Sequence, residues 1–178
     1  MTTKKRERPR RARLIDPEVG TFLRIPLADG SFGYGRALQD PYMAFYKHRT
    51  MEPSSDLDVI EAQPVLFTTA VRLRDIDEWT LLEARPLAGE VAQPVVMFMQ
   101  DLGDYRKCRI FDTAGMKRSA TPEECIGIER ASVWDGHHIE ERLLDNLLGR
   151  PNAQEIRGRV RLTGRPDPFE NIKLTRRR

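Results

Sequence analysis

The chain has few of the residues that build disulfide frameworks or metal cages, because its 178 residues include two cysteines and three histidines. Cys108 and Cys125 are too few for a disulfide framework, and their separation is not that of a zinc site. A cage of four His or Cys ligands would use almost all of these side chains. We therefore expect reduced thiols, no cofactor and a cytoplasmic location.

Long apolar runs are also missing from the sequence. No stretch of about 18 apolar residues could form a transmembrane helix, so we expect no membrane partner. The basic N-terminal residues are followed by no apolar segment, so we expect no secretory signal. Hydrophobic residues make up 39% of the chain and charged residues 32%, which at this length suits one domain with a core of its own.

The net charge of +3 is unevenly distributed along the chain. Residues 1–13 carry seven basic side chains and one acidic, and residues 151–178 carry eight basic and three acidic. Residues 14–150 carry fifteen basic and twenty-three acidic side chains, a net charge of −8. We predict a disordered basic arm over 1–13, a single globular domain over 14–150 and a basic, largely irregular tail over 151–178. Val160 and Leu162 suit one short strand in that tail.

Two alternating runs near the start of the domain predict a β-hairpin. Thr21–Leu27 and Phe32–Leu38 alternate apolar side chains with others, and Asp29-Gly30 lies between them, where glycine accepts the positive φ of a tight turn. The glycines and the alanine of the second run share one face, which would let another element approach closely. Pro26 has no N–H for the ladder, so the first strand is predicted to lie at an edge or a bulge.

Further runs predict a mainly β fold with one helix. Strands are expected at Met43–His48, Val65–Leu73, Trp79–Ala84, Val95–Gln100 and Tyr105–Phe111. Val95–Met99 is apolar on both faces, so we expect it to be central. A helix is predicted after an N-cap at Asp135, with an apolar face that includes Leu143 and an end at Gly149. The fold class is mainly β (α+β): a strongly curved antiparallel sheet or small barrel of about six or seven strands with one packed C-terminal helix.

The opening of the domain carries a family motif. Gly20 is followed by Ile25-Pro26-Leu27, a glycine turn and Tyr34-Gly35-Arg36. This pattern resembles the opening of the immunity protein 26 family of bacterial polymorphic toxin systems, and later pieces extend the resemblance over residues 17–152. The resemblance implies an immunity protein that binds and neutralises a cognate toxin by stoichiometric contact. A small phosphotriesterase is grouped with the family, so a phosphotriesterase-like hydrolase acting on organophosphates is the alternative.

The residues themselves offer little for hydrolysis. Paired-metal phosphotriesterases need several histidine and carboxylate ligands, and the strongest set is His137, His138 and Glu141 at the start of the predicted helix. The spacing is not that of HExxH, and acidic residues suit the positive end of a helix dipole. We interpret this segment as a solvated helix start and expect no metal. No Gly-x-Ser-x-Gly turn is present, so no catalytic residue is assigned and binding is favoured over catalysis.

Stoichiometric binding needs a complementary surface. Many toxin domains attack nucleic acids and are basic, and the acidic body can attract such a partner over a long range. The acidic candidates for partner contact are Asp56, Asp58, Asp75, Asp77, Glu78, Asp101 and Asp104. Tyr34 and Arg36 of the second strand are further candidates, since Arg36 can hold a carboxylate of the partner, or one within the protein, in two-point fashion.

The basic ends give a third hypothesis, a non-specific nucleic-acid binder. Dense lysine and arginine give salt-dependent binding that ignores sequence. Residues 1–13 hold no aromatic side chain that could stack on bases, so we expect at most weak nucleic-acid binding through the tails. The sequence leaves the oligomeric state open between a monomer and a small homo-oligomer.

Overall fold

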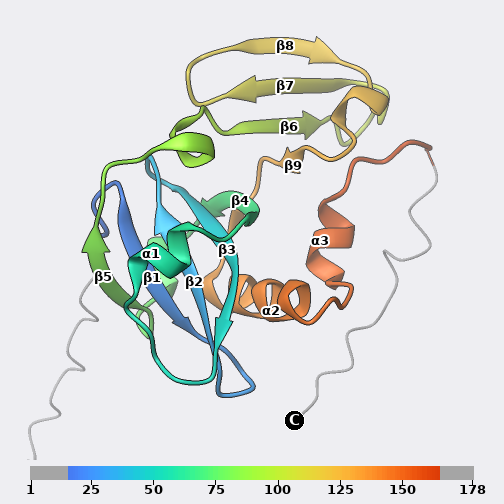
Figure 1. Cartoon of the computed structure of the whole chain (residues 1–178). Coiled ribbons are helices and arrows are strands. Elements are labelled where there is room, and N and C mark those ends of the chain that lie inside the picture. Colours follow the sequence, from blue (N-terminus) through green and yellow to red (C-terminus); the bar gives the residue numbers. More distant parts are fainter. Residues whose placement is uncertain (1–15, 165–178) are drawn as a thin grey trace, which may run out of the picture.

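The computed structural model describes residues 16–164, and Figure 1 traces their path. The predicted arm over 1–13 and the end of the predicted tail lie outside the described residues. Residues 16–164 form two β-sheets, three α-helices and three short 3-10 turns. None of these helices is long and apolar enough to span a membrane.

The larger sheet has six strands in the order β10-β4-β3-β2-β1-β5. Their bounds are β1 Thr21–Pro26, β2 Phe32–Ala37, β3 Tyr42–Thr50, β4 Val65–Val71, β5 Thr80–Ala84 and β10 Val133–Trp134. Neighbours are antiparallel, except that β10 runs parallel to β4. Gly30 has a φ of +81° between β1 and β2, which confirms the predicted hairpin turn.

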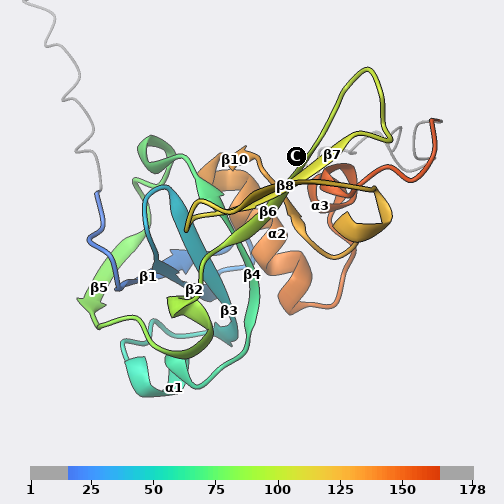
Figure 2. The ribbon, with the colours of Figure 1, turned by 90° about the horizontal axis from the view of Figure 1, so that it is seen from above.

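The smaller sheet has four strands in the order β8-β7-β6-β9. Their bounds are β6 Val96–Gln100, β7 Cys108–Asp112, β8 Lys117–Ala120 and β9 Glu129–Arg130. This sheet lies beyond one end of the larger sheet (Figures 1 and 2). Because β9 pairs with β6 and β10 pairs with β4, the segment 129–134 joins the two sheets.

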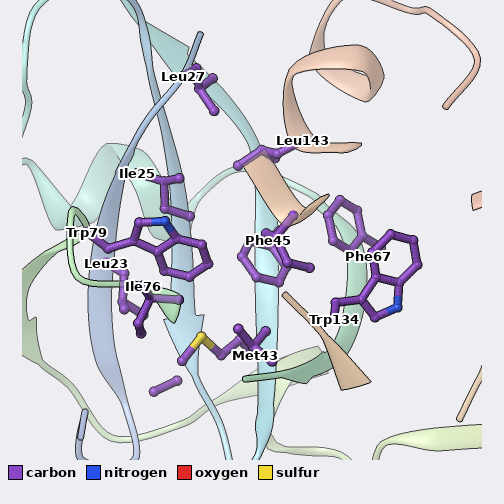
Figure 3. Close-up of a cluster of buried hydrophobic side chains, with 13 residues drawn as sticks. Leu23, Ile25, Leu27, Met43, Phe45, Phe67, Ile76, Trp79, Trp134 and Leu143 are labelled. Atoms are coloured by element: carbon purple, nitrogen blue, oxygen red, sulfur yellow. The ribbon is translucent and has the colours of Figure 1, made fainter. Parts of the chain in front are cut away.

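Helices cover both faces of the larger sheet. Helix α1 (Leu57–Glu61) packs on the face that carries Phe22, Tyr34 and Tyr46. Helix α2 (Gly136–Leu147) packs through Ile139 and Leu143 on the opposite face, over the largest hydrophobic cluster (Figure 3). Helix α3 (Ala153–Gly158) follows α2, and the 3-10 turns are Leu73–Asp75, Gly89–Ala92 and Glu123–Cys125.

The glycine face of β2 is where α2 comes closest to the sheet. A Cβ atom added to Gly33 would lie 2.5 Å from Cδ2 of Leu143, so a larger residue would push the helix away. The predicted close approach at this face is confirmed. The predicted helix is confirmed as well, with Leu143 completely buried.

The mainly β class is confirmed, but the sheets do not close into a barrel and residues 16–164 hold ten strands rather than six or seven. The prediction missed β8, β9 and β10. Strands β9 and β10 have two residues each, and the four residues of β8, Lys117–Ala120, show no apolar alternation. The predicted strand at Val160 and Leu162 does not form, and α3 stands at the start of the predicted tail instead.

Of the two places predicted for strand β1, an edge or a bulge, the structure shows a bulge. Strand β5 pairs with the first residues of β1, and the register shifts between Thr21 and Leu23. Pro26 lies beyond that pairing, so its missing N–H costs no bond to β5. Strand β6 is internal to the smaller sheet, as predicted, although Val96 and Met99 are 43% and 55% exposed. The small second sheet has too little structure around it to bury both of its faces.

Truncating Leu143 to alanine should lower the free energy of unfolding by about 2–5 kcal/mol, because its side chain is fully buried against the glycine face of β2. Leu148→Ala is the control, since Leu148 caps the same helix but is 36% exposed. Urea unfolding followed by circular dichroism measures both. A loss below about 1 kcal/mol for Leu143→Ala would mean that α2 is not docked by this residue.

Candidate functional site

Arg36 holds three parts of the chain together from the interior. Its side chain is fully buried, with Nη1 2.6 Å from Oε1 of Glu61 at the end of α1. Its Nη2 donates to the carbonyls of Arg85 and Pro86, both at 2.9 Å, and the guanidinium lies 4.4 Å from the centre of the Phe22 ring. Of the two roles expected for Arg36, the bond to an internal carboxylate is the one that the structure shows, and the buried guanidinium presents no surface to a partner.

Tyr34 is also completely buried, so it does not offer a partner contact either. Its hydroxyl lies 2.6 Å from Oγ1 of Thr50 and accepts a hydrogen bond from the backbone N–H of Ser54 at 3.0 Å. Tyr34 thus fixes the loop that leads to α1. The hydrogen bond from Arg36 holds the pKa of Glu61 below its usual value, so this link is lost only in acid.

Four of the predicted acidic residues have local structural roles. Asp56 caps α1 by accepting from the N–H of Val59 at 3.2 Å, and Asp58 lies 2.7 Å from Arg85. Asp101 accepts from the N–H groups of Gly103 and Asp104 in the turn before β7, and these bonds lower its pKa. The bond from Arg106 lowers the pKa of Asp104 in the same turn. These carboxylates stabilise their own loops at neutral pH, whatever else they contact.

Another of the predicted acids, Glu78, lies close to α2. Asp77 and Glu78 are exposed, and Glu78 lies close enough to Glu140 of α2 to raise its pKa. Glu140 accepts a hydrogen bond from Nε1 of Trp79 at 2.7 Å, and burial is the largest cause of its raised pKa. Exposed Glu141 adds to the same repulsion. We call Asp77, Glu78, Glu140 and Glu141 the acidic patch; the predicted Asp75 lies just before it, and its side chain is not described.

Sequence reasoning missed Glu140 as a member of this acidic group. It lies 61 positions from Trp79, and no local pattern links the two. The sequence offered only one weak indication. Glu140 is a carboxylate in the first turns of the predicted helix, and it lies next to the apolar face that packs on the sheet.

The histidines at the start of α2 do come together, but not with the predicted carboxylate. The rings of His137 and His138 have centroids 3.9 Å apart, and their nitrogens lie within 4.8 Å of each other and of a carboxylate oxygen of Asp135. Glu141 is not part of this group, which corrects the predicted set. Asp135 is the N-cap residue of α2, yet its side chain caps no N–H and instead lies 2.6 Å from Nη1 of Arg72.

A cleft of about 870 Å³ lies between the two sheets, which we call the inter-sheet cleft. Apolar side chains of β4 and β6 line it, together with Ile128 and Val160. Arg142 of α2 reaches its wall, with two hydrogen bonds of 2.7 and 3.0 Å to the carboxylate of Glu129. The Arg142 guanidinium also lies 4.0 Å from the centre of the Phe67 ring. The ion pair therefore joins α2 to the segment that carries β9 in the wall of the cleft.

The two cysteines lie in the core of the smaller sheet. Cys108 and Cys125 pack with Phe98 and Ile110 in one buried cluster. Burial raises the pKa of Cys125 to about 11, so its thiol is protonated at neutral pH. Cys108, which is 4% exposed, packs there as a small buried hydrophobe.

The residues described so far define a mainly β protein with charged surfaces and a cleft between two sheets. The model of a known family, Immunity protein 26, matches residues 18–109, which is more than half of the chain. The chain belongs to this family. The match spans β1 to the start of β7 and includes Arg36, Glu61 and Arg85; α2, which we had included in the resemblance, lies outside it. No curated protein and no solved structure matches the chain.

Proposed function

We propose that the protein is the immunity component of a bacterial toxin system and neutralises a cognate toxin in the cytoplasm by stoichiometric binding. Membership of the Immunity protein 26 family is the observation that carries this proposal. A protein of this kind works through a complementary surface and needs no turnover. The most direct test is co-expression: the toxin encoded next to the gene should be lethal alone and harmless with this protein, and the two should purify as a complex.

The acidic patch is the surface that we assign to the toxin. Asp77, Glu78 and Glu141 are exposed, and Glu140 lies among them with a raised pKa. Crowded carboxylates repel one another, so a cationic partner that comes between them lowers the free energy of the complex. The net charge of −8 over residues 14–150 extends this attraction beyond direct contact.

Reversing Asp77 and Glu78 to lysine should slow association with the toxin by at least about tenfold at low salt, because electrostatic steering raises association rates by that factor or more. The control is Glu83→Lys with Glu123→Lys, which changes the net charge by the same amount at exposed positions outside the patch. Stopped-flow association measured at several salt concentrations gives the comparison. Equal slowing by the two variants, or no dependence on salt, would contradict the assignment of this surface.

The basic tails should be dispensable for neutralisation if the acidic body carries the interaction. A truncation that tests this has to spare α3, because Glu155 accepts a hydrogen bond from Asn146 of α2 and Asn152 bonds Asp145. Removing residues 1–13 and 165–178 leaves all of these contacts in place. Loss of protection in this truncated form would assign the function to the tails.

A further inference from the structure

The start of α2 brings three side chains with metal-ligand atoms to one point. One atom each of Asp135, His137 and His138, a carboxylate oxygen and two imidazole nitrogens, lies within 4.8 Å of the others. Zinc holds nitrogen and oxygen ligands at about 2.0–2.2 Å, so the ligand atoms of a tetrahedral site stand roughly 3.4 Å apart. The group is therefore close to the size of such a site, and small side-chain rotations complete it.

The direction of these three side chains is unusual for the start of a helix. Successive side chains of a helix point about 100° apart, so residues i and i+1 do not normally face each other. Yet the ring centroids of His137 and His138 lie 3.9 Å apart. Asp135 also departs from its usual role, because its side chain caps no N–H of α2. Burial does not force the arrangement, since His137 is exposed. A shared ion accounts for the convergence of all three.

Two side chains from other elements hold the ligands in place. Arg72, which precedes the 3-10 turn Leu73–Asp75, lies 2.6 Å from Oδ1 of Asp135. Gln154 of α3, the helix that follows α2 (Figure 1), lies 3.3 Å from Nε2 of His138. Metal-binding carboxylates and imidazoles are commonly oriented by outer contacts of this kind. An ionised carboxylate has about four lone-pair sites, so one ion pair does not use it up.

A hollow of about 350 Å³ lies beside the group, lined by Asp135 and His138 together with α3 and residues 130–134. Zinc sites with three protein ligands keep the fourth position for water or a substrate, whereas closed structural sites have four protein ligands. The hollow supplies room for a water molecule in that position. The group therefore matches an open site with three protein ligands.

Charges of both signs surround the group. Three arginines line the hollow and oppose a cation: Arg72, Arg130 and Arg157. The charge of Arg72 is shared with Asp135. Glu140 of the acidic patch lies within electrostatic reach of His137 and favours a cation. Because these contributions oppose one another, we expect affinity in the micromolar range.

We propose that Asp135, His137 and His138 bind one divalent transition-metal ion such as zinc, with water in the open position. Mixed nitrogen and oxygen ligands suit zinc, whereas calcium and magnesium prefer oxygen ligands alone. From the sequence we expected no metal, because the set considered was His137, His138 and Glu141. The structure replaces Glu141 by Asp135, which brings the third ligand within reach. The proposal rests on this geometry and is independent of the toxin surface proposed above.

Zinc titrated into the full chain without an affinity tag should bind one to one with a Kd of about 10 µM or tighter, measured by isothermal titration calorimetry. His137→Ala should weaken binding at least about tenfold, because it removes a ligand from an exposed position where the fold does not depend on it. His48→Ala is the matched control: His48 is the remaining histidine of the chain and lies on β3, so zinc affinity should not change. Weaker binding by the wild type, or equal effects of the two variants, would overturn the proposal.

Asp135→Asn distinguishes a site of three ligands from a simple pair of neighbouring histidines. Asparagine is as good an N-cap residue as aspartate, so α2 keeps its start. The variant loses the charged ligand, so zinc affinity should fall at least about tenfold and the visible absorption of bound cobalt(II), which reports ligand number and geometry, should change. Glu141→Gln removes the same charge from an exposed position of α2 outside the group and should leave both readouts nearly unchanged. Unchanged zinc affinity in Asp135→Asn, or an equal loss in Glu141→Gln, would contradict the site.

Discussion

Replacing Gly20 by alanine should lower the free energy of unfolding by at least about 4 kcal/mol, one of the largest effects expected of a single substitution in this chain. Gly20 has a φ of +91°, and a Cβ atom there would lie 2.1 Å from the carbonyl oxygen of Arg85. That oxygen belongs to the backbone and cannot rotate away. It is also one of the acceptors of Arg36, so moving it would pull apart the contacts that join β2 to the chain after β5.

Gly115→Ala is the matched control for this substitution. Gly115 has a φ of +98°, but nothing lies within 4 Å of the position where its Cβ would stand. It should therefore show only the cost of a positive φ, about 1–2 kcal/mol. Thermal and urea unfolding of both variants measure the difference, which isolates the collision with Arg85. Equal losses in the two variants would mean that the backbone conformation, not the contact, makes glycine necessary at position 20.

The local part of this fold could be predicted from the sequence. Alternation in Phe32–Ala37 divides β2 into a bulky face and a glycine face, and the structure places α1 over the first and α2 over the second. The leucine spacing in α2 places Leu143 on the apolar face of the helix, and the structure shows this residue against Gly33. Both predictions use side-chain periods of 2 and 3.6, which depend on neighbours in the chain.

The pairing of distant segments could not be predicted in the same way. The segment 129–134 pairs with β6 through two residues and with β4 through another two, and so few residues carry no periodic signal. Without that segment the two sheets look like one continuous set of strands, which suggested a single curved sheet or barrel. The inter-sheet cleft follows from this division, so no pattern in the sequence predicted it.

The acidic patch and the contacts of Arg36 could not be predicted for the same reason, since their residues come from segments that are distant in the sequence. Asp77 and Glu78 are neighbours in sequence, but the carboxylate of Glu140 comes near Glu78 only after α2 docks. The internal partner of Arg36 could not be named for a related reason: Glu61 lies 25 positions away, and Arg36 looks the same in the sequence whether its carboxylate is internal or external.

Arg142→Ala should cost about 3–5 kcal/mol of unfolding free energy, because it removes one member of a largely buried ion pair and leaves the other without compensation. The side chain of Arg142 is 5% exposed and that of Glu129 is 21% exposed. The guanidinium also lies 4.0 Å from the centre of the Phe67 ring, so the alanine variant loses packing as well as charge. The loss should be accompanied by weaker attachment of β9, which carries Glu129.

Two further variants distinguish the effect of burying the ion pair on stability from the effect of the ion pair itself. Arg118→Ala breaks a bridge of the same length, 2.7 Å to Glu124, but both side chains are more than 40% exposed, so it should cost less than about 1 kcal/mol. The double variant Arg142→Met with Glu129→Gln removes both charges and keeps most of the volume, so it should be much more stable than Arg142→Ala. Urea unfolding of the three proteins gives the answer. If the double variant is as unstable as Arg142→Ala, the loss in Arg142→Ala does not come mainly from leaving Glu129 as an unpaired charge. The attraction between Arg142 and Glu129 would then itself stabilise the wall of the inter-sheet cleft.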